Sequence, residues 1–135
     1  MNYELIEERS WIVEEEVRDL RERTKEFALR IIRMFSALPK TTEAQVLGKQ
    51  VLRSGTSIGA NYREAFRARS RPEFTSKLGE CLKELDETGY WLELLTESQI
   101  VSATRLERLR DECNQLTAIF TTIAKKSKAN PPPNS

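Results

Sequence analysis

Cationic side chains crowd one stretch of this chain, between positions 49 and 71. On a helix with about 100° per residue, four of them share an arc of about 80°, and the stretch is about 33 Å long. Glu64 is the only acid between Arg53 and Glu73, so counter-charges are scarce. Such a stripe can bind a phosphate backbone or an acidic protein partner, and a solvated face is the alternative. The candidate nucleic-acid-binding residues are Lys49, Arg53, Arg63, Arg67, Arg69 and Arg71.

The stretch that follows carries the opposite charge. Carboxylates can serve acid–base or metal chemistry, but these recur at helical spacing with no second set of ligands nearby. We therefore expect a solvated or subunit-facing acidic side. Its natural match is the basic stretch, either in the same chain or in another copy. The acids are Glu80, Glu84, Asp86, Glu87, Glu93 and Glu97, against only Lys77 and Lys83.

Several kinds of active site are excluded by the residues that the chain lacks. It has no histidine, which removes histidine-based acid–base catalysis and histidine metal ligation. Gly55 and Gly59 are not followed by the Lys-Ser/Thr pair of a phosphate-binding loop. No serine or cysteine nucleophile has a candidate histidine base. We expect a protein that is not an enzyme, with no catalytic, cofactor-binding or metal-ligating residues.

Length and composition fit one small helical domain. The chain has 135 residues, of which 32% are charged, and its formal net charge is +1. We expect a single domain over 1–128, with 1–12 as an extension that continues the first helix or forms a separate turn, and a disordered tail over 129–135. No signal peptide is evident, and the longest uncharged run, 113–124, is too short to cross a bilayer. A cytoplasmic location without membrane contact is the expectation.

Two cysteines lie far apart and form no CxxC pair. Cys81 and Cys113 both fall at apolar helical positions. Buried, reduced thiols are therefore expected, since a disulfide would require the two helices to face each other at these positions and would be rare in a cytosolic chain.

Two predicted helices come before the acidic stretch, and the second of them carries most of the basic stretch. Apolar residues at alternating three- and four-residue spacing predict a first helix over about 13–37, ended by Pro39. The second begins at Thr42, whose spacing to Gln45 is that of a capping box, and runs to about Arg69. Its predicted core face consists of Ala44, Leu47, Val51, Gly55, Ile58, Tyr62, Ala65 and Phe66.

The remaining sequence predicts two further helices. Ser70 and Glu73 form a second capping box, and Pro72 suits the first turn of the helix that they open. The fourth helix ends in "KKSK", whose positive charge suits a helix C-terminus. Four amphipathic helices with short connections predict an all-α fold, an antiparallel up-down four-helix bundle.

Glycines inside the second helix need an explanation, because each costs a helix about 1 kcal/mol relative to alanine. Gly48, Gly55 and Gly59 lie on or beside the predicted core face. Small residues at these positions allow two helix backbones to approach closely, so the gain in packing offsets the loss of helix propensity.

The stretch "RSGTSIGANYREAFRARSRPEFTSKLGECLKELDET" resembles a bacterial four-helix-bundle family first recognised in ribosomal-RNA intervening sequences. The resemblance covers roughly residues 17–127. The sequence departs from the family pattern at Tyr62 and Phe66. The positions that match are Arg53, Ser57, Ile58, Asn61, Glu64, Glu73, Phe74, Glu84 and Leu85. We take Gly55, Ser57, Ile58, Gly59, Asn61, Glu64 and Glu84 as the motif and packing residues.

The resemblance implies a bundle that assembles as a ring-shaped homopentamer. The chain is also similar to the accessory variability proteins of diversity-generating retroelements, which are basic pentamers that bind a reverse transcriptase and nucleic acid. Thr56, Ser57 and Ala60 would then let a neighbouring subunit or a phosphate backbone approach the outer side of the second helix. Two hypotheses remain: a non-enzymatic accessory protein that binds RNA or DNA, a reverse transcriptase or both, and a protein-only scaffold or adaptor.

Overall fold

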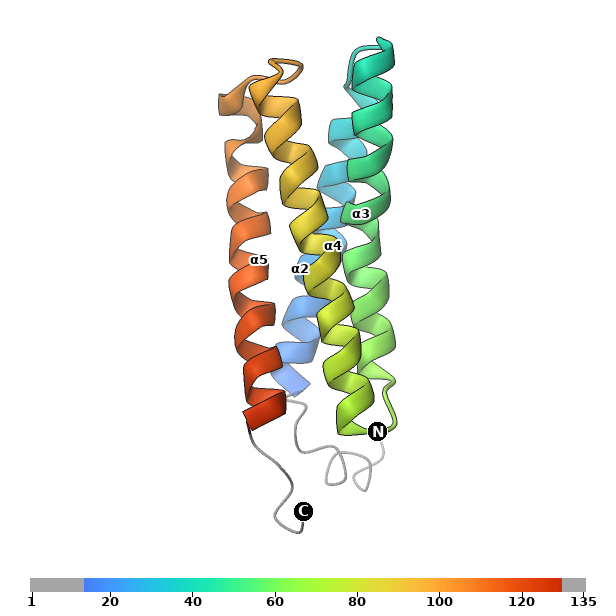
Figure 1. Ribbon diagram of the computed structural model, residues 1–135, viewed down its shortest axis with the longest axis vertical. Helices are drawn as coiled ribbons and strands as arrows, with labels where there is room; N and C mark the ends of the chain where they lie inside the picture. The colour runs from blue at the N-terminus through green and yellow to red at the C-terminus, as the bar shows by residue number, and fades with distance from the viewer. Residues whose placement is uncertain (1–13, 130–135) are drawn as a thin grey trace.

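Four helices lie side by side and run alternately up and down in the computed structural model of the chain (Figure 1). The structure describes the backbone of residues 14–129 and the side chains of residues 19–128. Within this part there is no strand, so the predicted all-α four-helix bundle is confirmed. The predicted extension over 1–12, and the tail apart from residue 129, lie outside the described residues. The helices are α2 (Glu14–Ser36), α3 (Thr42–Phe66), α4 (Arg71–Glu97) and α5 (Ala103–Ala129).

The start of α3 differs by one residue from the capping box expected at Thr42. Thr41 is the N-cap, and its side chain accepts a hydrogen bond from the backbone N–H of Ala44 at 3.3 Å. Gln45 instead donates its side-chain amide to the carbonyl of Pro39 at 2.9 Å. Adjacent threonines offer the same capping chemistry, and the sequence spacing selected the wrong one.

The turn between α3 and α4 is longer than expected. We expected the second helix to reach about Arg69, whereas α3 ends at Phe66 and Arg67 is its C-cap. The cap of α4 is as expected: Ser70 accepts from the backbone N–H of Glu73 at 3.2 Å, and a proline lies in the first turn. Three arginines of the basic stretch therefore lie at or beyond the end of α3: Arg67 at its C-cap, Arg69 in the turn and Arg71 at the start of α4.

The core joins α3 to α2 and α4, and α4 to α5, while α2 and α5 contact each other least. The edge of the Tyr62 ring meets the Phe120 ring across the bundle, with 5.3 Å between centroids. Where α2 and α5 meet, Arg23 forms a two-pronged ion pair with Glu112, at 2.6 and 3.2 Å. This loose seam leaves a shallow groove between the two helices.

The three glycines of α3 lie against α2, as their positions predicted. A Cβ atom added to Gly55 would lie 2.9 Å from Cγ1 of the buried Ile31. One added to Gly48 would lie 2.5 Å from Leu38 Cδ1, and one added to Gly59 would lie 3.1 Å from the side-chain oxygen of Thr24. Close approach between α2 and α3 therefore depends on the absence of these side chains.

Both cysteines are buried and free, as expected. Burial raises the pKa of the Cys81 thiol to about 12 and that of the Cys113 thiol to about 11. Each thiol lies near a backbone carbonyl, Cys81 near Ile58 and Cys113 near Leu85. No described helix is long and apolar enough to cross a membrane.

Candidate nucleic-acid interface

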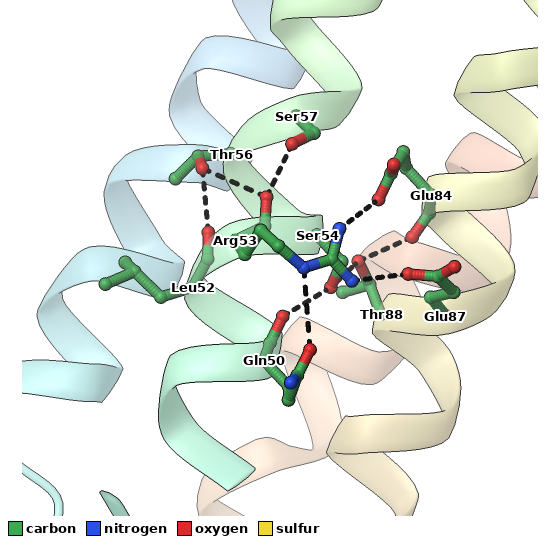
Figure 2. Close-up of polar contacts among 9 residues, drawn as sticks. All are labelled: Gln50, Leu52, Arg53, Ser54, Thr56, Ser57, Glu84, Glu87 and Thr88. Carbon is green, nitrogen blue, oxygen red and sulfur yellow. Dashed lines mark hydrogen bonds and ion pairs between the residues drawn. The ribbon is translucent and has the colours of Figure 1, made fainter. Parts of the chain in front are cut away.

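Arg53, the second cation of the predicted basic stripe, is paired with the acidic helix of its own chain. Its two terminal nitrogens contact Glu87 at 2.6 Å and Glu84 at 3.3 Å, both on α4 (Figure 2). The hydrogen bond to Glu87 raises the pKa of the guanidinium. The opposite charges that the sequence placed on these two helices therefore meet within one chain at this point.

A buried hydroxyl pair lies beneath this ion pair (Figure 2). Ser54 and Thr88 are fully buried, and their side-chain oxygens are 2.9 Å apart. Their remaining contacts are to backbone carbonyls of their own helices, those of Gln50 and Glu84. Sequence reasoning missed this pair, whose signal is one hydroxyl residue beside the apolar face of each helix. The pair joins α3 to α4 next to the ion pair of Arg53.

The small hydroxyl residues on the outer side of α3 bond to their own helix. Ser57 donates to the carbonyl of Arg53 at 2.6 Å, and Thr56 donates to that of Leu52 at 2.7 Å. Ala60 beside them is exposed. The middle of this face thus carries only short side chains, and their hydroxyl groups already donate to carbonyls of α3.

Arg71 also has a partner within the chain. Its guanidinium donates to the carbonyls of Ser127, through Nε, and of Lys126, at 3.4 Å through Nη2. These are carbonyls of the last turn of α5, which lack partners within their own helix. Arg71 therefore closes the end of α5 and does not continue the stripe of α3.

Four of the six candidates keep their charge exposed. Lys49, Arg63, Arg67 and Arg69 are exposed, and none forms an ion pair with a described carboxylate. The acid nearest in sequence, Glu64, is held by Lys77 of α4 at 2.7 Å. The positive charge of Arg63 and Arg67 is therefore not neutralised by their own helix.

The family-motif residues divide between core and surface. Gly55 and Ile58 are buried, and Gly59 and Asn61 are partly buried. Glu84 accepts a hydrogen bond from the guanidinium of Arg53. The arginine and glutamate of the motif thus form one contact between α3 and α4, in spite of their separation in the sequence.

Comparison with known proteins fits this geometry. Residues 4–122 match the family described as 23S rRNA-intervening sequence protein. The chain belongs to this family. A solved relative is a protein of unknown function from the S23 ribosomal protein family of Bacteroides thetaiotaomicron, 38% identical, with a TM-score of 0.76. The match covers 81% of this chain and 97% of that one. No curated protein matches significantly. For this member of the 23S rRNA-intervening sequence family, the comparisons thus establish family and fold.

Proposed function

We propose that this protein is a non-enzymatic, oligomeric accessory protein that binds nucleic acid through exposed cations of α3 and the turn after it. The observation that supports this most is that Arg63, Arg67 and Arg69 are exposed with no described carboxylate to neutralise them. Guanidinium groups bind phosphate oxygens strongly and without regard to base sequence. A reverse transcriptase as an additional partner, and a cytoplasmic location, belong to the same proposal.

The competing function is a protein-only scaffold, in which the basic helix pairs with the acidic helix of a neighbouring subunit. The contacts of Arg53 disfavour this version, since its two carboxylate partners come from its own chain. The carboxylates that the scaffold would need for subunit contacts are those left on α4, such as Asp86 and Glu93, which are exposed and form no ion pair with a described cation.

A filter-binding titration at two salt concentrations tests the proposal. Each phosphate contact releases counterions, so the affinity for RNA or DNA must fall steeply with salt. The double variant R63Q/R67Q should lower both the affinity and the steepness of the salt dependence, while a sizing column shows the assembly unchanged.

The scaffold predicts the reverse result: the double variant breaks the oligomer, and the wild type binds no nucleic acid even at low salt. Arg53→Gln is the matched control for the single variant Arg63→Gln, because it removes one charge from the same helix, a charge that is already held by carboxylates. Absence of binding by the intact wild type rejects direct nucleic-acid binding and leaves only a function that requires a partner protein.

A further inference from the structure

One end of the bundle brings together basic residues that are far apart in the sequence. The end of α3, the start of α4 and the end of α5 lie at the same end of the molecule (Figure 1). Arg71, at the first position of α4, donates to two carbonyls in the last turn of α5. The side-chain hydroxyls of Thr75 and Ser127 are also hydrogen-bonded to each other. The first turn of α4, which directly follows the α3–α4 turn, is therefore held against the end of α5.

This contact places a second group of cations at the same end of the bundle as the arginines of the turn. Lys125, Lys126 and Lys128 are exposed, and none is ion-paired with a described carboxylate. Arg67 and Arg69 are exposed on the turn itself. From the sequence, these lysines were interpreted only as positive charge that suits the C-terminus of the fourth helix. The sequence does not show that the turn after α3 lies at the same end of the bundle.

The acids near this end do little to cancel the charge. Glu73 accepts a hydrogen bond from the backbone N–H of Arg69 at 3.3 Å, and Glu64 is held by Lys77. Asp19 lines the same groove between α2 and α5 as Lys126, but no ion pair joins them. Among the described side chains, Asp19 and Glu73 are therefore outnumbered by Arg67, Arg69 and the three lysines, and the surface formed by the turn and the end of α5 has a net positive charge.

Arg71 changes what this surface can bind. The free carbonyls at the end of a helix carry partial negative charge, which repels an anion. The guanidinium of Arg71 occupies two of these carbonyls, and the lysines project from the same turn. The end of α5 is thus open to an anion that an uncapped helix end would disfavour.

From this juxtaposition we infer that Lys125, Lys126 and Lys128 form a second phosphate-binding surface, continuous with Arg67 and Arg69. This inference rests on the proposed function. Nucleic acid is held across the end of the bundle and not along α3 alone. Neighbouring helices pack about 8–10 Å apart, so α3 and α5, diagonal in the bundle, are separated by about 14 Å. That span is several times the rise per phosphate of one strand along the duplex axis, about 3.4 Å. One backbone can therefore contact both groups.

The test compares two triple variants that lose the same charge. K125Q/K126Q/K128Q removes the proposed surface, and K40Q/R105Q/R108Q removes three exposed cations near the opposite end of the bundle. The probe is a short RNA duplex of about two helical turns, titrated at several salt concentrations. We expect the lysine variant to lose at least about tenfold in affinity at low salt and about two units of salt slope. The control variant should lose much less of both.

The outcomes separate this inference from the proposed function. If the wild type binds no RNA, both are overturned. If R63Q/R67Q weakens binding while the lysine variant matches its control, the surface at the end of α5 is overturned and the function of α3 stands. The charge-conserving variant K125R/K126R/K128R should bind like the wild type. If it binds as weakly as the glutamine variant, the loss reflects a frayed helix end and the inference is again overturned.

Discussion

At the residue scale, the glycines of α3 are important because a larger side chain at their positions would clash with residues packed against α3. Gly55 has Ile31 against it, whereas a Cβ atom on the exposed Gly79 of α4 would meet nothing within 4 Å. Gly55→Leu should therefore overpack the contact between α2 and α3 and lower the free energy of unfolding by about 1–3 kcal/mol. Gly79→Leu should raise it by about 0.5–1 kcal/mol through helix propensity. Urea unfolding of both variants measures the difference. Equal effects would show that close helix approach is not the reason for Gly55.

The buried thiols give a prediction that depends on pH. Because burial raises the pKa of Cys81 to about 12 and that of Cys113 to about 11, both stay protonated in the folded protein at pH 8–9. A thiol reagent should label neither cysteine in the native protein and both in urea, since only the thiolate reacts. Both pKa values lie above the unfolded value of 9.0. The unfolded state therefore loses these protons first, and stability should fall as the pH rises from about 9 towards 12. Rapid native labelling at pH 8 would contradict the burial.

The sequence was most informative about residues whose environment is set by their own helix. Val51, Ile58 and Tyr62 were expected on the core face of the second helix, and they are buried. Ser54 and Thr88 were missed because, besides the carbonyls of their own helices, they bond to each other across 34 positions of the sequence. A single-helix wheel cannot show such a pair, since hydroxyl residues are on average surface residues.

At the scale of elements, Arg53 joins two helices and contributes little to stability. Its side chain is 51% exposed, and exposed ion pairs contribute about 0–1 kcal/mol. Arg53→Gln should therefore lower the free energy of unfolding by less than about 1 kcal/mol. It should leave RNA affinity close to that of the wild type, because its charge is already directed at Glu84 and Glu87. Thermal unfolding and the filter-binding titration provide the two measurements. A loss of affinity as large as that of R63Q/R67Q would place Arg53 among the phosphate contacts.

Helix types and order follow from periodicity, and helix ends follow less securely. The end of α3 was placed three residues too far along, because the arginines that follow Phe66 are good helix formers. What ends the helix is Ser70, whose extended backbone caps α4 and forces the chain to turn first. The basic stretch is consequently divided between a helix face and a turn. Because α4 begins at Arg71, this arginine contacts α5, and no local pattern in the sequence indicates that contact.

At the scale of the whole molecule, the net charge of +1 conceals an uneven surface. Acids and bases neutralise each other where α3 meets α4, while the bundle end with the turn and the last lysines stays positive. A nearly neutral protein can therefore bind a polyanion at one end without being attracted to it everywhere. The specificity of such binding would come from the arrangement of several copies.

Oligomerisation is the prediction that connects these scales. Tyr90 is 53% exposed, its ring centroid lies 5.1 Å from that of Trp91, and the buried Nε1 of Trp91 has no hydrogen-bond partner among the described residues. An exposed aromatic side chain beside an unsatisfied donor favours a second protein surface there. Multi-angle light scattering at micromolar concentration should give several times the monomer mass of 15.6 kDa, about 78 kDa for a pentamer.

The variant Tyr90→Asp tests whether that surface joins the subunits. It should shift the mass towards 15.6 kDa without loss of helical circular dichroism, because the side chain is mostly outside the core. It should also weaken RNA binding more than the change of one charge explains. A ring presents several basic ends to one nucleic acid, and linked sites bind far more tightly than separate ones. A wild type that elutes as a monomer would remove this multivalent contribution. The affinity of a single basic end would then have to account for all binding.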